Sequence, residues 1–199
     1  MRPSPFLAAF TAAALVTPAL HAQTGWSDLG PEAQIALAVQ AAPADLRGGA
    51  LVQGYDEAGS FVTLREGSND LVCMAPNPEA ERFEVSCHHA GLEAFFARGR
   101  ELLAEGVTGQ DRIRARWEEY EAGKLDIPYG SINYILTGTG VDAATGEIEG
   151  AYLRWTIYTP WATSATTGIS GQPSQGGPWL MLPGTPGSHI MITPPAGGA

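Results

Sequence analysis

Residues 147–160, EIEGAYLRWTIYTP, carry the pattern that decides the fold. Within this stretch apolar side chains alternate with polar or amphipathic ones: Ala151, Leu153, Trp155 and Ile157 against Tyr152, Arg154, Thr156 and Tyr158. Successive side chains of a β-strand point to opposite faces, so this period of two predicts a strand with one apolar and one mixed face. Such strands are typical of antiparallel sheets that bury one side.

Neighbouring segments extend this sheet in both directions. The strand-like INYILTGTG at 132–140 precedes it across the turn-rich DAATG at 142–146, which predicts a long hairpin. Residues 50–55 and 60–65 predict a second hairpin, because the intervening DEAG has turn chemistry. Two short strand candidates follow, at 179–182 and 189–193.

The first predicted helix lies near the N-terminus. It begins at Pro31, because proline is tolerated at the first helical position, and Pro43 stops it.

Two further helices are predicted in the middle of the chain. Residues 90–105 place an apolar stripe at helical spacing, and Gly106 is positioned to end the helix. A T-x-x-D start signal at Thr108 opens another helix, which Gly123 ends. Together these elements predict an α+β fold: one antiparallel sheet with an N-terminal helix and an αα-hairpin packed on one face.

The N-terminus has the order of a secretory signal. A positive Arg2 precedes an uncharged apolar run at 6–20, and Ala22 suits the small residue before a signal-peptidase cut. The run is too short for a membrane span, although an uncleaved anchor is the alternative. We therefore expect 1–22 to be a signal peptide, 23–194 a single globular domain and 195–199 a flexible tail, in a secreted or periplasmic protein.

The charge of the chain restricts its partners. It has 11 Lys and Arg against 21 Asp and Glu, for a net charge of −10. Nucleic acids and anionic membrane surfaces are themselves negative, so we expect neither as a partner. No segment after the N-terminal run is apolar enough to span a membrane. The expected partner is an unknown ligand or a component of the cell envelope.

Cys73 and Cys87 are the two cysteines of the chain. An even number of cysteines in an exported protein favours pairing, so we expect a disulfide that holds down an irregular, proline-containing loop. Two free thiols or thiolate metal ligands are the alternative. The spacing is much wider than the C-x-x-C of zinc and redox sites, which favours the disulfide.

Three residues could form a metal site. His89 and Glu93 are four apart and would share a helix face, and His189 would join them if the fold brought it near. Two histidines and a carboxylate suit a mononuclear zinc hydrolase, which needs only three protein ligands plus water. The alternative is that the histidines are unrelated and structural. The spacing matches no short metalloprotease motif, so zinc is a possible cofactor and not the expected one.

Aromatic side chains flank a long segment rich in Thr, Ser, Gly and Pro at 159–178, which is either disordered or functional. Trp161 and Trp179, with His189, could present a binding platform, because an aromatic ring offers an apolar face beside a polar edge. The simpler interpretation is that Trp155 packs in the core and that the other aromatic residues cover the edge of the sheet.

No motif identifies a reaction. Gly168-Ile169-Ser170-Gly171 lacks the final glycine of a nucleophile elbow, because Gln172 stands there. We therefore expect a non-enzymatic module that binds a ligand or envelope component. A metal-dependent hydrolase using His89, Glu93 and His189 and a structural or interaction module are the alternatives.

Leu64–Asn69 (LREGSN) is followed by Cys73, a proline-containing loop, Cys87 and a helix. This arrangement resembles a segment of a group of uncharacterised exported bacterial proteins. His189-Ile190-Met191-Ile192 stands where the group ends in Pro-His-Val-Met-Ile. This chain departs from the group at Asp70-Leu71, where the group has Gly-Trp. The resemblance implies kinship and no activity, because none is assigned to the group.

The LREGSN segment itself predicts a turn. Gly67 would supply a positive φ, and the Asn69 side chain would bond to its own backbone.

Overall fold

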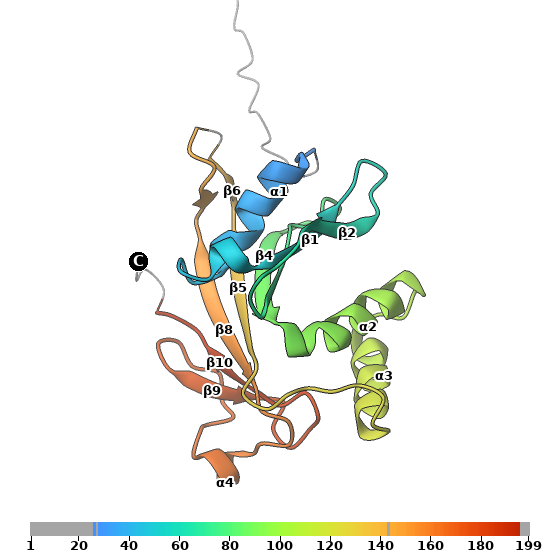
Figure 1. Ribbon diagram of the computed structural model, residues 1–199. Helices are drawn as coiled ribbons and strands as arrows, with labels where there is room; N and C mark the ends of the chain where they lie inside the picture. Colours follow the sequence, from blue (N-terminus) through green and yellow to red (C-terminus); the bar gives the residue numbers. More distant parts are fainter. Residues whose placement is uncertain (1–25, 27, 143, 196–199) are drawn as a thin grey trace, which may run out of the picture.

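The computed structural model describes residue 26, residues 28–142 and residues 144–195. The expected signal peptide and most of the expected tail lie outside these residues. Eight strands form one sheet, which in spatial order comprises β2 (Phe61–Arg65), β1 (Leu51–Tyr55), β3 (Leu71–Met74), β4 (Phe83–His89), β5 (Ile132–Gly138), β8 (Tyr152–Tyr158), β10 (His189–Ile192) and β9 (Pro178–Met181). β6 (Gly140–Val141) and β7 (Ile148–Glu149) form a separate pair (Figure 1).

The α+β class is confirmed, and the sheet is mixed rather than purely antiparallel. Neighbouring strands are antiparallel except β1 and β3, which run parallel. The two predicted hairpins are present as β1–β2 and β5–β8. None of the helices that the structure describes is long and apolar enough to cross a membrane.

Alternation along β4, in the middle of the sheet, separates the two faces. Phe83, Val85 and Cys87 belong to the hydrophobic core. Glu84, Ser86 and His88 point the other way, since they occupy the alternate positions of the strand.

The apolar face is covered by the N-terminal helices. α1 (Pro31–Ala38) and η1 (Val39–Ala41) pack there, followed by η2 (Arg47–Gly49). The core on this face joins buried side chains of these helices and of the central strands: Leu37, Ala38, Ala41, Ala42, Val52, Leu71, Cys73, Phe83, Val85, Cys87 and Leu136. The Gln34 side chain fixes α1 to β1, because it accepts from the Tyr55 N–H at 2.8 Å and donates to the Tyr55 carbonyl at 2.8 Å.

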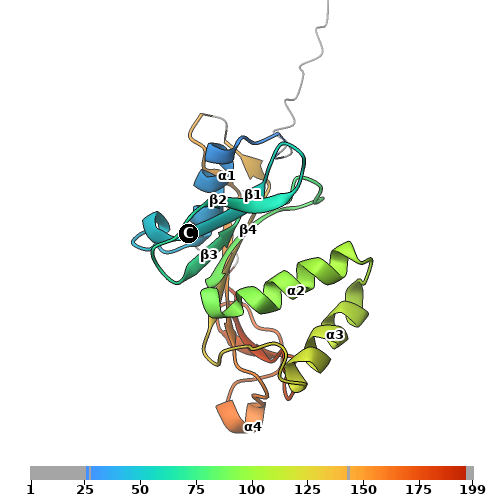
Figure 2. The same cartoon turned by 45° about the vertical axis from the view of Figure 1, so that its right-hand side comes forward.

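The αα-hairpin lies on the opposite face, which corrects the expectation that all helices share one face. It consists of α2 (Glu93–Ala104), preceded by η3 (Ala90–Leu92), and α3 (Gly109–Glu121). Figures 1 and 2 show it on the other side of the sheet from α1. The physical reason is that both faces of the central strands are covered, and the hairpin covers the polar one. Its own small apolar cluster, around Leu92, Phe95, Ile127 and Tyr158, anchors it.

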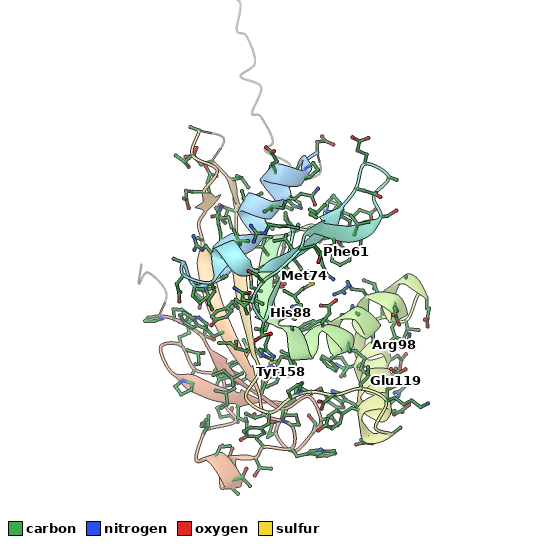
Figure 3. All side chains as sticks on the ribbon, viewed as in Figure 1. Phe61, Met74, His88, Arg98, Glu119 and Tyr158 are labelled. Atoms are coloured by element: carbon green, nitrogen blue, oxygen red, sulfur yellow. A yellow bond between two sulfur atoms is a disulfide. The ribbon has the colours of Figure 1, made fainter. Side chains whose placement is uncertain are left out.

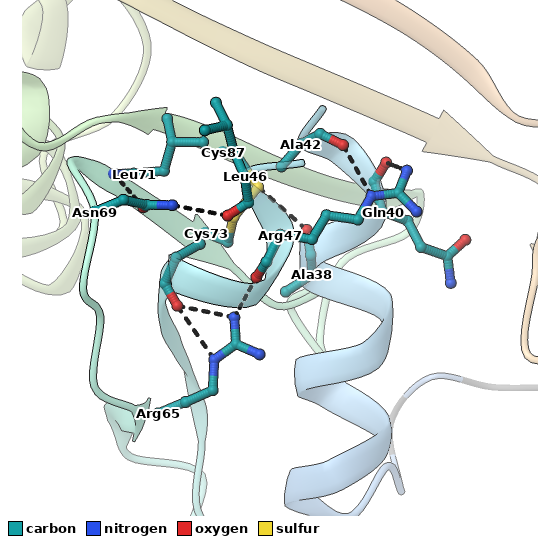
Figure 4. Close-up of a disulfide and its surroundings, with 11 residues drawn as sticks. Ala38, Gln40, Ala42, Leu46, Arg47, Arg65, Asn69, Leu71, Cys73 and Cys87 are labelled. Carbon is teal, nitrogen blue, oxygen red and sulfur yellow. Dashed lines mark hydrogen bonds between the residues drawn. A yellow bond between two sulfur atoms is a disulfide. The ribbon is translucent and has the colours of Figure 1, made fainter. Parts of the chain in front are cut away.

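The predicted disulfide is present, and its setting differs from the prediction. Cys73 and Cys87 are bonded and lie directly opposite each other on β3 and β4 (Figure 4). Both are fully buried, and Cys87 Sγ lies 3.4 Å from the Ala38 carbonyl oxygen. The bond therefore joins two central strands beneath α1, and only residues 75–82 form a loop between them.

The LREGSN segment crosses over the start of β1 and is hydrogen-bonded to the residues just before it. The chain must pass from β2 to β3, on the two sides of β1, within a few residues. The Ser68 and Asn69 amides both donate to the Gly49 carbonyl, at 2.7 and 3.0 Å. The Asn69 side chain donates to the Leu46 carbonyl at 2.8 Å and accepts from the Leu71 amide at 3.0 Å (Figure 4).

At this crossing the backbone of residue 67 passes so close to Leu51 that only glycine fits there. Its φ is not positive, contrary to the prediction, but a Cβ there would lie 2.6 Å from the Leu51 nitrogen. The Asx-type turn at Asn69 is confirmed, because its side-chain oxygen bonds to the backbone two residues on.

The Thr/Ser/Gly-rich segment at 159–178 has defined local structure. It contains the short helix α4 (Ser164–Thr167), which opens with a capping box between Thr163 and Thr166. Backbone hydrogen bonds tie it to neighbouring strands and loops, for example from the Leu180 amide to the Ser170 carbonyl at 2.8 Å.

The disulfide sets the first prediction. Replacing both Cys73 and Cys87 by alanine removes a cross-link over a sequence separation of 14. The chain-entropy model gives a loss of about 3 kcal/mol in the free energy of unfolding. Urea denaturation of the variant and of the wild type, each with and without reductant, measures it. A reductant that left the wild type as stable as before would contradict this expectation.

The crossing sets the second prediction. Gly67→Ala should lower the free energy of unfolding by about 1–3 kcal/mol, because the added methyl group meets the Leu51 backbone. Gly48→Ala is the matched control, since a Cβ there has nothing within 4 Å. Equal urea midpoints for the two variants would refute the steric explanation.

Candidate functional site

A cleft of about 450 Å³ lies between the polar face of the sheet and the αα-hairpin. Strands β1 to β4, β8 and the loop after β3 form one wall, and α2 and α3 form the other. The lining residues are Tyr55, Phe61, Met74, Ala75, Asn77, Ala80, Arg82, Glu84, Ser86, Phe96, Gly99, Arg100, Leu103, Arg112, Arg116 and Tyr158. Figure 3 labels three of the lining residues that belong to the sheet, Phe61, Met74 and Tyr158. The volume falls within the range of small-molecule sites.

Two arginines from α3 reach this cleft. Arg112 and Arg116 are one helical turn apart, so they share a face of the helix. The Arg116 guanidinium lies 4.2 Å from the centroid of the Phe95 ring on α2. Gly99 makes room for it, because a Cβ at Gly99 would lie 3.0 Å from Arg116 Nη1.

A partly buried ion-pair network supports the inner wall of the cleft. Glu93 Oε2 lies 2.7 Å from Nε2 of the fully buried His88, and Glu93 Oε1 accepts from Arg100 Nη2 at 2.5 Å. Gln53 also donates to Glu93 Oε1, at 3.2 Å. An ionised carboxylate only accepts hydrogen bonds, so His88 carries its proton on Nε2.

This network stabilises the ionised form of Glu93. Burial raises the pKa of the Glu93 carboxyl, but hydrogen bonds from His88 and Arg100 and the charge of Arg100 outweigh it and lower the pKa below its usual value. The Arg100 guanidinium also lies 4.7 Å from the centroid of the Phe61 ring on β2. Arg100 is therefore held across the cleft from α2 to the sheet.

Two hydroxyl groups belong to the sheet wall. Ser86 lies on β4, and Tyr158 ends β8. Burial raises the pKa of the Tyr158 phenol to about 12, against the opposing effect of the Arg116 charge. Tyr158 is therefore protonated and able to donate a hydrogen bond at neutral pH.

An ion-pair network joins the two helices of the αα-hairpin that carries the arginines. Arg98 Nε on α2 donates to both carboxylate oxygens of Glu119 on α3, at 3.0 and 3.1 Å (Figure 3). Arg98 Nη1 also reaches Glu101 and Glu105, each at 3.1 Å. Arg98 thus joins three carboxylates in one network, which fixes the two helices more firmly than an isolated surface pair.

The structure does not bring together the three residues considered as metal ligands. His89 ends β4, where its Nδ1 accepts from the Gly91 amide at 3.1 Å, so it does not share a helix face with Glu93. Glu93 binds the neighbouring His88 instead.

His189 lies still further away. It begins β10, separated from β4 by β5 and β8, which places the two strands about 14 Å apart. The strand registers also put His89 and His189 on opposite faces of the sheet. No group of three or more His, Cys, Asp and Glu that could hold a metal ion occurs in the described part of the chain.

The three residues considered as a binding platform are not among the residues that line the cleft. Trp161 is 49% exposed and has a φ of 65°, and Leu182 on a neighbouring loop has a φ of 54°. Trp179 is partly buried on β9 at the edge of the sheet, paired with Met191. The His189 ring packs on Tyr158 at 5.5 Å between centroids, and its Nδ1 donates to the Gly187 carbonyl at 2.7 Å.

Sequence reasoning missed the cleft residues on α3. The sequence analysis did not single out Arg112 and Arg116, although both are partly buried and line the cleft. Their spacing of four residues places both arginines on the same face of α3, and this was the feature of the sequence that could have identified them as a pair.

Comparisons with protein-family models, with curated proteins and with solved structures found no match for this chain.

The Glu93 network sets the third prediction. A carboxyl with a lowered folded-state pKa contributes stability above its unfolded pKa, and the contribution is lost as pH falls through the folded value. Glu93→Gln should therefore cost about 1–3 kcal/mol at neutral pH, and the deficit should shrink as the pH falls to about 3. Urea denaturation across this pH range measures it.

Glu118→Gln is the control, because Glu118 is an exposed carboxyl that lies 3.7 Å from Arg114. A deficit for Glu93→Gln that did not change with pH would refute the role of the ionised carboxylate.

Proposed function

We propose that this chain is an exported, non-enzymatic module that binds a small ligand in the cleft between the sheet and the αα-hairpin. The observation that carries the proposal is the cleft itself. Its two walls come from separate elements, and charged, hydroxyl and aromatic side chains converge on it. A mostly preformed concavity with a few polar groups among apolar ones is the usual form of a ligand site.

The surroundings of His88 support binding rather than proton transfer. Its side chain is fully buried, and its Nε2 already bonds to Glu93. A general base must come within hydrogen-bond reach of the proton that it takes from a substrate. The imidazole of His88 instead supports the cleft wall, because its ring packs against the Phe96 ring with 4.5 Å between the two centroids.

Export is supported by two independent features. The N-terminal residues have the order of a secretory signal. The buried Cys73–Cys87 disulfide suits an oxidising compartment, where such bonds form and persist. We therefore place the working protein in the periplasm or outside the cell, as the resemblance to exported bacterial proteins also implies.

Blocking the cleft sets the fourth prediction. Ala80 is a partly buried lining residue, so Ala80→Trp should fill part of the space. Ala94→Trp is the matched control, because Ala94 is exposed on α2 and does not line the cleft. A broad panel of small molecules, including cell-envelope saccharides and peptides, is screened by NMR against the purified protein.

We expect bound ligands to shift resonances of cleft residues. Ala80→Trp should weaken binding about tenfold or more, which corresponds to about 1.4 kcal/mol, and Ala94→Trp should not. Ligands that bind Ala80→Trp as tightly as the wild type would place the site elsewhere and refute the proposal.

A further inference from the structure

We infer that the cleft takes a small organic anion, whose carboxylate or phosphate oxygens bind Arg112 and Arg116 and whose apolar body lies against Phe96 and Leu103. This inference rests on the proposed function, since it names the class of ligand for the same cleft.

The charge of the cleft is opposite to that of the protein. The chain has a net charge of −10, with 11 Lys and Arg in total. Four of these line the one cleft: Arg82, Arg100, Arg112 and Arg116. Glu84 is the acidic residue among the lining residues, and it lies 3.6 Å from Arg154. An anion approaching this acidic protein is therefore attracted to the cleft and repelled elsewhere.

Among the described residues, three of the four arginines form no ion pair with a carboxylate: the exposed Arg82, and Arg112 and Arg116 on α3. Arg100 is neutralised by Glu93. Arg114, between them on the exposed side of α3, pairs with both Asp111 and Glu118. The helix thus provides carboxylates for the arginine that faces solvent and none for the two that face the cleft.

The two unpaired arginines on α3 are also poorly solvated. Nε of Arg112 and Nε of Arg116 are buried with no hydrogen-bond partner in the described residues. Burial lowers the pKa of the Arg116 guanidinium; the nearby Tyr158 opposes this shift, and the charge of Arg112 adds to it. Like charges four apart on a helix are destabilising. Arg116 Nη1 already donates to the Phe95 carbonyl oxygen at 3.5 Å. An anion held by the other terminal guanidinium nitrogens would offset the repulsion between the two arginines and the burial of their charge, because it neutralises the two charges together.

The other lining groups complete a site for an amphiphilic anion. The protonated Tyr158 hydroxyl beside Arg116 can donate to an oxyanion. Phe96 and the 49% exposed Leu103 form an apolar strip on α2. Guanidinium groups suit carboxylate and phosphate because their planar fork matches two oxygens at once. A ligand with an anionic head and an apolar body satisfies both parts of the cleft.

The test uses four probes that share a phenyl ring and differ in their polar group. Phenyl phosphate, phenylacetate, benzyl alcohol and benzylamine are titrated into the mature protein, with affinity from calorimetry and location from NMR. We expect both anions to bind with one equivalent and to shift cleft resonances. The alcohol and the amine should bind about tenfold more weakly or not at all.

Charge-matched variants separate a specific site from general attraction. Arg112→Gln should weaken binding of both anions about tenfold, and Arg114→Gln should leave it unchanged although it removes the same charge from the same helix. Arg116→Lys keeps the charge and loses the planar fork, so it should weaken binding of both anions relative to the wild type, although less than Arg112→Gln does. Circular dichroism verifies folding, and Arg116→Lys carries the test if Arg112→Gln does not fold.

Each other outcome overturns the inference in a distinguishable way. Equal affinity for benzyl alcohol and the anions would retain the cleft as a ligand site and refute its preference for anions. Equal losses in Arg112→Gln and Arg114→Gln would show attraction by net charge alone. If neither anion moves a cleft resonance, the anion inference fails, and the screen with Ala80→Trp decides separately whether the cleft binds anything.

Discussion

The alternation of side chains along β4 is the constraint on which the rest of the structure depends. One face of β4 belongs to the hydrophobic core, through Phe83, Val85 and Cys87. The alternate residues Glu84, Ser86 and His88 therefore lie on the other face. Because β4 lies at the centre of the sheet, its neighbours β3 and β5 follow the same division. A helix can pack closely on the first face by burying apolar surface, and the second face offers it mainly polar groups.

The two faces therefore carry different kinds of helix packing. On the apolar face α1 lies directly on the strands, fixed by Gln34 and by the core. On the polar face the αα-hairpin touches the sheet through a small cluster around Phe95 and Tyr158 and through the Glu93–His88 pair. Arg98 and Glu119 hold its two helices together independently of the sheet. The space left between hairpin and strands is the cleft, and its polar lining follows from the same alternation.

The sequence was sufficient for elements whose pattern is local. The period of two at 151–158 and the turn chemistry at 56–59 predicted β8 and the first hairpin, and the apolar stripe at 90–105 predicted α2. β3 and β4 were missed because the two prolines between the cysteines suggested an irregular loop. The alternation of RFEVSCHH at 82–89 was nevertheless present, with polar residues on one side. The cleft could not be predicted, because it depends on which face the hairpin covers, and that choice is made by tertiary contacts.

The placement of Cys73 opposite Cys87 has a consequence for the pairing of β3 and β4. A slip of one residue between β3 and β4 would turn one sulfur to the polar face and the other to the core, and the two could no longer meet. Once formed, the bond therefore excludes pairing of β3 and β4 in a register shifted by one residue. Reduction of the bond would remove this constraint and leave the register to the ladder hydrogen bonds and to the burial of alternate side chains.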